Sequence, residues 1–80
     1  MKFRIDIRRK EGLSDPEGMT TQQALQDLGY SGVTSTHFGR TIYLEMDADD
    51  PSSATSDVEA MCRQLLANPV IEDFEIEVVG

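Results

Sequence analysis

Apolar and polar residues alternate in two stretches of the chain, one near each end. In "FRIDIRR" (residues 3–9) the apolar side chains fall on every second position, and they do so again in "FEIEV" (residues 74–78). Successive side chains of a strand point to opposite faces, so each stretch predicts a half-buried strand. The polar face of the last strand carries the carboxylates of Glu75 and Glu77.

Two other stretches have helical spacing and share a start signal. Asp15-Pro16 and Asp50-Pro51 each place an N-cap before a proline at the first helical position. The first helix is predicted from about Pro16 to Leu28, with Gly29 as its stop and an apolar stripe at Thr21, Ala24, Leu25 and Leu28. The second ends at Asn68-Pro69, and its stripe comprises Ala54, Val58, Met61, Cys62 and Leu65.

The segment "GVTSTHFGRTIYLEMDA" predicts two strands joined at Gly39-Arg40. The second strand is the clearer, because its residues alternate strictly. The register of the first, Val33–Phe38, is ambiguous: a two-residue turn directs His37 to the core face, and a three-residue turn directs Phe38 there. We favour Phe38 because it is the more hydrophobic.

The element order is therefore β-α-β-β-α-β over a single domain, residues 1–80. This order predicts an α+β two-layer sandwich of ferredoxin-like topology, with two helices on one face of an antiparallel sheet. In that topology the first and last strands are neighbours, which brings Lys2, Arg4 and Arg8 within pairing distance of Glu75 and Glu77. Each exposed pair contributes only about 0.2–1 kcal/mol.

Length and composition narrow the class of protein. A chain of 80 residues buries only about 60–65% of its unfolded surface, so we expect it to form a homodimer or a higher oligomer. No apolar run is long enough to span a membrane, and the first ten residues do not resemble a signal peptide. With a single cysteine, the chain has no disulfide framework, and we expect a cytoplasmic location.

The charge is both strongly negative and unevenly distributed. A net charge of −8 argues against binding to nucleic acid. Five of the seven basic residues lie in the first ten positions, whereas nearly all acidic residues follow them. We therefore expect the first segment to lie against acidic neighbours, in the same subunit or across an interface.

No catalytic, cofactor-binding or metal-ligating residues are predicted. Cys62 lies on the apolar stripe of the second helix, where burial is the simpler interpretation than reactivity. His37 is the only histidine, so the usual zinc constellation is missing. The acidic stretch "DADDPSSATSD" lacks the glycine and glutamate of a calcium loop, and there is no glycine-rich phosphate loop. The residues by themselves indicate a small acidic interaction domain.

Four segments carry a resemblance to a known family: "DPEG" (15–18), "ALQDLGYSGV" (24–33), "FGRTIYLEM" (38–46) and "MCRQLLANPVIEDFEIEV" (61–78). In order and spacing they resemble the PurS family, the small subunit of phosphoribosylformylglycinamidine synthase, also called FGAR amidotransferase. The segment "TSTHF" (34–38) departs from the family, in which a more aliphatic strand is expected.

The resemblance implies an accessory subunit of an ATP-dependent glutamine amidotransferase, a ligase that forms a C–N bond in de novo purine synthesis. In such complexes the large synthetase subunit uses ATP and magnesium, a glutaminase subunit releases ammonia, and dimeric PurS joins the two and supports ammonia transfer. Exposure and charge suggest the partner contacts Arg4, Arg8, His37, Arg40, Glu75 and Glu77.

Other functions remain open at this point. An ACT-like regulatory dimer that binds a small ligand has the same element order, and the glycine-containing first loop, "KEGLSDPEG", is compatible with it. An RNA-binding domain of this topology is disfavoured by the charge and by the scarcity of sheet aromatics. An enzyme acting alone is the least favoured reading.

Overall fold

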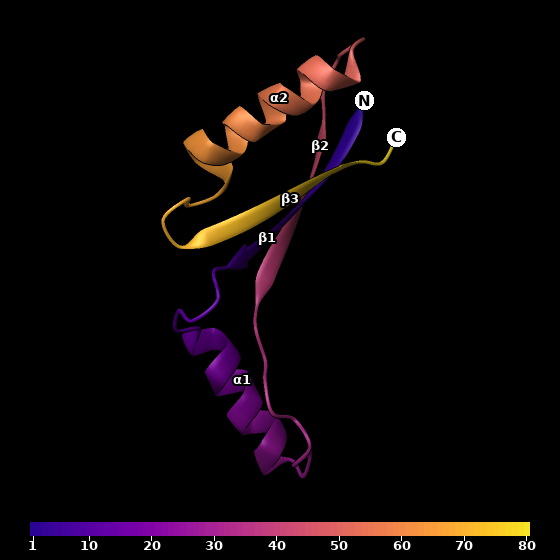
Figure 1. Ribbon diagram of the computed structural model, residues 1–80. Helices are drawn as coiled ribbons and strands as arrows, with labels where there is room; N and C mark the ends of the chain where they lie inside the picture. The colour runs from indigo at the N-terminus through magenta and orange to yellow at the C-terminus, as the bar shows by residue number, and fades with distance from the viewer.

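The computed structural model describes residues 1–80 without a gap and confirms the α+β class (Figure 1). Its elements follow in the order β1 (Lys2–Arg9), α1 (Pro16–Asp27), β2 (Gly39–Glu45), α2 (Pro51–Met61), a π-helical turn η1 (Cys62–Leu66) and β3 (Glu72–Val78). No helix combines the length and the apolar character needed to cross a membrane.

The sheet is antiparallel and has three strands in the order β2-β1-β3. The first strand is therefore central. The prediction that the first and last strands are neighbours in the sheet is confirmed. Ile5 lies opposite Ile42 on β2 and opposite Ile76 on β3. Because the strand period is two, this register directs an apolar row to one face and the charged residues to the other.

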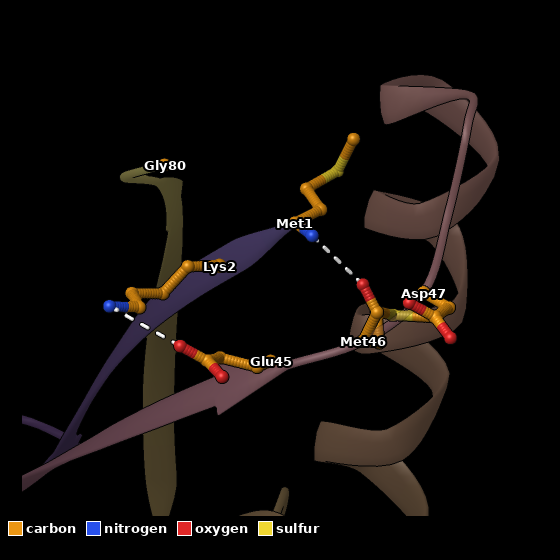
Figure 2. A pocket seen from close by; sticks show the side chains of 6 residues that line it. All are labelled: Met1, Lys2, Glu45, Met46, Asp47 and Gly80. Atoms are coloured by element: carbon orange, nitrogen blue, oxygen red, sulfur yellow. Dashed lines mark hydrogen bonds and ion pairs between the residues drawn. The ribbon is translucent and has the colours of Figure 1, made fainter.

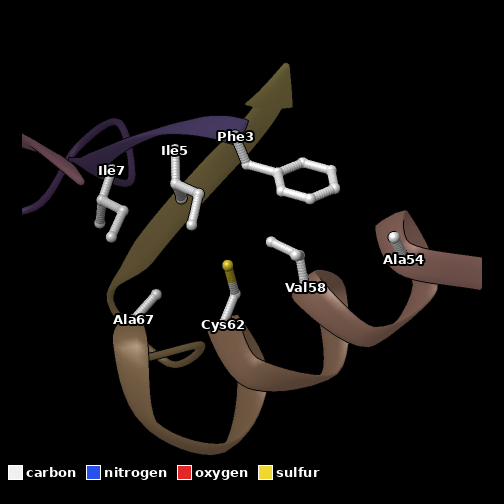
Figure 3. Close-up of a cluster of buried hydrophobic side chains, with 7 residues drawn as sticks. All are labelled: Phe3, Ile5, Ile7, Ala54, Val58, Cys62 and Ala67. Carbon is white, nitrogen blue, oxygen red and sulfur yellow. The ribbon is translucent and has the colours of Figure 1, made fainter. Parts of the chain in front are cut away.

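The core lies between the sheet and α2 (Figure 3). Side chains from β1 meet the helix stripe there, and all members are at most 8% exposed: Phe3, Ile5, Ile7, Ala54, Val58, Cys62 and Ala67. Burial of a side chain such as Phe3 or Ile5 contributes about 1.5–3 kcal/mol. The predicted burial of Cys62 is confirmed.

The turn η1 changes which leucine packs inward. The Ala67 N–H donates to the Cys62 carbonyl at 2.9 Å, an i→i+5 bond that inserts one residue into the helical turn. Leu65 was predicted to continue the apolar stripe, and this prediction is wrong, since Leu65 is 82% exposed. The wider turn rotates the next two residues, Leu66 and Ala67, onto the core.

The strand predicted at Val33–Phe38 is not formed, so there is no hairpin turn at Gly39-Arg40. Residues 33–38 are irregular, and β2 begins at Gly39. The polar run Thr34–His37 has no apolar face to bury against a sheet. Phe38 is 40% exposed instead of facing the core. Its N–H donates to a side chain, the Asp15 carboxylate, and not to a strand.

The helix α1 does not cover the sheet, which corrects the prediction of two helices on one face. Residues 11–38, called the arm below, project from the sheet and carry α1 away from it (Figure 1). The molecule is accordingly elongated, 51 × 26 × 14 Å. Without a strand to return the chain along the sheet, nothing folds the arm back over β1.

The ends of α1 follow the predicted signals. Asp15 caps its first turn, with Pro16 at the first helical position. After the last turn Gly29 adopts φ +105, and the N–H groups of Gly29 and Tyr30 donate to Gln26 and Leu25. This pairing is a Schellman motif, which requires the left-handed conformation that glycine adopts readily. Local signals therefore form α1 without help from the sheet.

Candidate functional site

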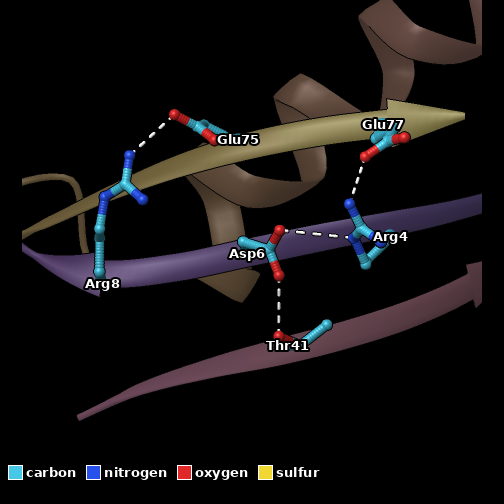
Figure 4. A network of polar contacts seen from close by, with 6 residues as sticks. All are labelled: Arg4, Asp6, Arg8, Thr41, Glu75 and Glu77. Atoms are coloured by element: carbon cyan, nitrogen blue, oxygen red, sulfur yellow. Dashed lines mark hydrogen bonds and ion pairs between the residues drawn. The ribbon is translucent and has the colours of Figure 1, made fainter.

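The helix-free face of the sheet carries paired charges (Figure 4). Arg4 on β1 donates to Glu77 on β3, and Arg8 donates to Glu75 at 2.8 Å. The predicted cross-strand pairing of these four residues is confirmed. All four side chains are more than a third exposed, so each pair contributes only about 0.2–1 kcal/mol.

Asp6 links this network to the third strand. Its Oδ2 lies 3.5 Å from Arg4 Nε, and its Oδ1 accepts a hydrogen bond from the Thr41 hydroxyl at 2.8 Å. Hydrogen bonds and ion-pair contacts therefore run across all three strands, from Thr41 on β2 to Glu77 on β3. This arrangement holds the side chains in a fixed pattern of alternating charge that a partner surface can match.

A second ion pair lies on the core side of the sheet, at its end. Arg40 donates to Glu72 at 2.5 and 3.0 Å and to the Leu66 carbonyl at 2.7 Å, and Glu72 also accepts the Asn68 N–H at 2.8 Å. The hydrogen bonds from Arg40 and then from Asn68 lower the pKa of Glu72, and the bond to Glu72 raises the pKa of Arg40. Arg40 thus connects β2 to η1 and β3 within the chain.

Glu72 is a residue that the sequence reasoning missed, although a signal was present. Arg40 is in phase with Ile42, and Glu72 is in phase with Phe74, so the strand period places both charges on the core face. Two opposite charges in phase with apolar residues on different strands predict an internal pair.

A third cluster surrounds Asp15, where the arm joins the sheet. Asp15 Oδ1 accepts the Gly18 N–H at 3.0 Å, and Oδ2 accepts the Phe38 N–H at 2.8 Å. These two bonds, in that order, lower the pKa of Asp15; burial opposes them, and Arg9 and His37 contribute weaker attraction. His37 Nδ1 is 3.9 Å from Oδ2, and its side chain is 75% exposed.

A hollow of about 600 Å³ lies at the end of the sheet where β2 leaves it (Figure 2). The Met1 amine donates to the Met46 carbonyl at 2.9 Å, and Lys2 pairs with Glu45 at 3.3 Å. Lys2 was predicted to face the acids of the last strand; it is instead opposite Glu45 in the β1–β2 register. The two polar contacts close this end of the sheet.

The Cys62 thiol is fully buried, and desolvation raises its pKa, an effect only partly opposed by Arg63. A thiol held in its protonated form is a poor nucleophile. No group of three or more histidine, cysteine, aspartate or glutamate side chains is placed to hold a metal ion. The charged side chains of the sheet instead form ion pairs within and between strands.

Fold and polar groups together define the class: a small, elongated α+β protein with an antiparallel sheet, a ladder of paired charges and a projecting helical arm. A family model described as PurS, phosphoribosylformylglycinamidine (FGAM) synthase, matches residues 2–80. The chain belongs to the PurS family of FGAM synthase.

Individual relatives agree with this assignment. The phosphoribosylformylglycinamidine synthase subunit PurS of Methanocaldococcus jannaschii is 40% identical over 77 residues, which cover 96% of this chain and 93% of the relative. A solved structure of Bacillus subtilis PurS is 34% identical, with a TM-score of 0.87 and coverage of 99% and 98%. A structure of PurLQS from Thermotoga maritima gives a TM-score of 0.88 at 32% identity, covering 98% of this chain and 95% of that one.

Proposed function

We propose that this chain is a non-catalytic subunit that holds the synthetase and glutaminase subunits of FGAM synthase together during de novo purine synthesis. The observation that carries the proposal is its likeness, over 98% of its length, to a chain of the PurLQS structure from Thermotoga maritima. The exposed charges on the sheet support it, because the rim of a protein interface is polar and solvent-accessible.

The chemistry belongs to the partners in this proposal. The large subunit uses ATP and magnesium, the glutaminase releases ammonia, and the present chain aligns the two sites so that ammonia passes between them. Residues 1–80 act as a single domain, in the cytoplasm, where the substrates of purine synthesis are made and used.

The proposed unit of assembly is a homodimer, and the exposed surface supports it. The chain exposes 5722 Å², whereas a compact monomer of this mass exposes about 4,800 Å². The excess, roughly 900 Å², is close to the ≈ 800 Å² that each partner buries in an interface of standard size. Its radius of gyration is 16.2 Å, against about 12 Å for a compact domain.

In the proposed dimer, α1 of one copy packs on the sheet of the other. Its apolar stripe is largely uncovered: Ala24 is exposed, and Leu28 is 74% exposed. Beside α2, the core face of β2 carries Ile42 and Leu44, which are only partly buried. A helix from the second copy laid over β2 buries both sets of apolar side chains at once.

The helix-free face then remains for the other subunits. We assign to it the contacts of Arg4, Arg8, Glu75 and Glu77. The contacts of His37 and Arg40 are assigned to the end of the sheet nearest the arm, where Arg40 lies on the core face. Support comes from the exposure of these side chains and from the ladder that fixes the four of them in place.

Reconstitution of the complex tests the proposal. The chain is mixed with the synthetase and glutaminase subunits, and glutamine-dependent and ammonia-dependent synthesis are measured with and without it. We expect omission to abolish glutamine-dependent synthesis and to leave ammonia-dependent synthesis intact. Equal glutamine-dependent rates with and without the chain would overturn the proposal.

A charge swap tests the contact face separately. Arg4→Glu breaks the pair with Glu77, whereas the double variant Arg4→Glu/Glu77→Arg restores an internal pair with reversed polarity. If the face binds a partner, the double variant regains the part of the thermal midpoint that the cross-strand pair contributes, although a carboxylate at position 4 repels Asp6, and it still fails to co-purify with the other subunits. Co-purification of the double variant at wild-type yield would exclude this face.

A further inference from the structure

The arm is attached to the sheet by one buried carboxylate. Asp15 is the buried charged residue of the chain, 6% exposed, and it lies between the segment that leaves β1 and the segment that enters β2. Through Oδ1 it holds the first turn of α1, and through Oδ2 it holds Phe38, which is 23 residues further along the chain. The side chain of Asp15 therefore joins the two segments that connect the arm to the sheet.

The second aspartate N-cap shows what ordinary capping requires. Asp50 also precedes a proline and accepts one backbone N–H of its own helix, from Ser52 at 3.1 Å, and it is exposed. The bond from Asp15 to Phe38 has no counterpart there. Capping explains only half of what Asp15 does, and the other half fixes the arm.

Gly18 makes the same joint tight. A Cβ at Gly18 would lie 2.2 Å from the Thr36 carbonyl oxygen and 2.7 Å from Asp15 Oδ2, both well inside van der Waals contact. The backbone of α1 thus approaches the returning segment directly. Only glycine allows this approach, so Gly18 and Asp15 together set the angle at which α1 leaves.

No strand packs extensively against α1, and neither does α2. The direction of α1 is therefore determined by the contacts at Asp15 and Gly18 and not by side-chain packing against the sheet. Between α1 and the sheet there is little other contact that resists rotation of the helix.

From this geometry we infer that Asp15 is a positioning residue for assembly: with Gly18 it holds α1 at the one angle that presents the Ala24–Leu28 stripe to the sheet of a second copy. The inference rests on the dimer proposed above. The recognised partner is a second copy of this chain, and the contact is apolar.

The experiment compares Asp15→Asn and Gly18→Ala with two matched controls. Asp15→Asn places an amide N–H₂ opposite one of the two N–H donors, and Gly18→Ala forces the helix away from Thr36. Asp50→Asn makes the same substitution at the N-cap of α2, and Gly32→Ala adds a methyl group at a glycine with nothing within 4 Å of the added Cβ. Sedimentation equilibrium of the full chain gives the dimer dissociation constant.

The direction of α1 is measured independently. Spin labels are attached at Thr20→Cys and Ser56→Cys, both exposed, and labelled chain is diluted into excess unlabelled chain so that distances come from one copy. We expect a single narrow distance in the wild type and both controls. In Asp15→Asn and Gly18→Ala we expect a broad distribution and a dimer dissociation constant raised at least tenfold.

A purely structural role would lower the thermal midpoint without broadening the distance, and that result would overturn the inference. So would dissociation constants within twofold of the wild type in both variants. Should Asp15→Asn fail to fold, as judged by far-UV circular dichroism, Gly18→Ala decides. A wild-type chain that is monomeric at every concentration refutes the dimer, while the distance distributions still decide whether Asp15 positions α1.

Discussion

Two glutamates three residues apart on β3 have very different surroundings. Glu72 is 13% exposed and accepts hydrogen bonds from Arg40 and from the Asn68 N–H, whereas Glu75 is 68% exposed and has one bond, from Arg8. Solvent screens the exposed pair of Arg8 with Glu75, whereas the pair of Arg40 with Glu72 is partly shielded from water. The contribution of a carboxylate on β3 to stability therefore depends on which face of the sheet its side chain lies on.

We predict that Glu72→Gln lowers the free energy of unfolding by about 1.5–3 kcal/mol, because bonds to a charged group are lost in a partly buried place. Glu75→Gln should lower it by less than about 1 kcal/mol. Urea unfolding near neutral pH measures both. Equal losses would contradict the distinction between the two pairs.

The pKa of Asp15 predicts a pH dependence of stability. The native pKa lies below the ordinary value of 3.8, because two N–H groups bind the ionised form and Arg9 and His37 add attraction. Asp15 therefore contributes its full stabilisation above the ordinary carboxyl pKa, and loses it as pH falls through the native pKa.

Thermal midpoints of the wild type and Asp15→Asn, measured between about pH 2 and pH 7, test this. We expect the difference between them to be constant above about pH 4 and to shrink at lower pH. A difference that grows on acidification would mean that Asp15 is protonated more readily when folded.

At the scale of elements, local signals in the sequence predicted most helices and strands, whereas their placement in space depends on tertiary geometry. The Asp-Pro caps located the starts of both helices, and alternation located β1, β2 and β3 and the sheet face of each side chain. The segment Val33–Phe38 is predicted as a strand but is irregular in the structure, because Thr34–His37 offers no apolar face. The position of α1 was not predictable, because an amphipathic stripe is the same whether it packs on its own sheet or on another.

The polar contacts of the candidate site also divide into those that local sequence patterns predict and those that they do not. The pairs of Arg4 with Glu77 and of Arg8 with Glu75 came from strand order and period, both readable in the sequence. The bond between Asp15 and Phe38 did not, because it depends on how two irregular segments meet in space. Local sequence patterns predict contacts along a helix or strand and between regular neighbouring strands. They do not predict contacts between irregular segments.

The π-helical turn gives a prediction in which two adjacent leucines behave differently. Leu65→Ser should change the free energy of unfolding by no more than about 0.5 kcal/mol, as for other exposed positions. Leu66→Ser should lower it by about 2 kcal/mol, because Leu66 packs on the core. Chemical denaturation measures both. If the loss is larger at Leu65, the turn is an ordinary α-helical one in solution.

At the scale of the whole molecule, stability is expected to depend on concentration. With nine of 80 residues buried, the single chain has a small core, and the second copy of the proposed dimer would add buried area. A dimer that dissociates on unfolding has a melting temperature that rises with protein concentration. Scanning calorimetry over a hundredfold range of concentration measures this rise, and a constant melting temperature would argue against the dimer.

The apolar stripe of α1 can be tested at the same scale. Ala24→Glu retains a good helix former but places a charge in the proposed interface, so it should raise the dimer dissociation constant at least tenfold. Met19→Glu is the matched control, since Met19 is 66% exposed and lies half a turn away from the stripe. Equal effects of the two variants would locate the interface elsewhere.

The central place of β1 in the sheet has a further consequence, for the order of events during synthesis. β1 is the first strand made, yet one of its edges pairs only with β3, as in the bond between Arg4 and Glu77 across 73 positions of sequence. Contacts so distant in sequence slow folding. Phe3, Ile5 and Ile7 therefore have to remain without their full sheet until residues 72–78 have left the ribosome. Completion of the sheet, and any docking that requires the complete sheet, accordingly waits until β3 has emerged.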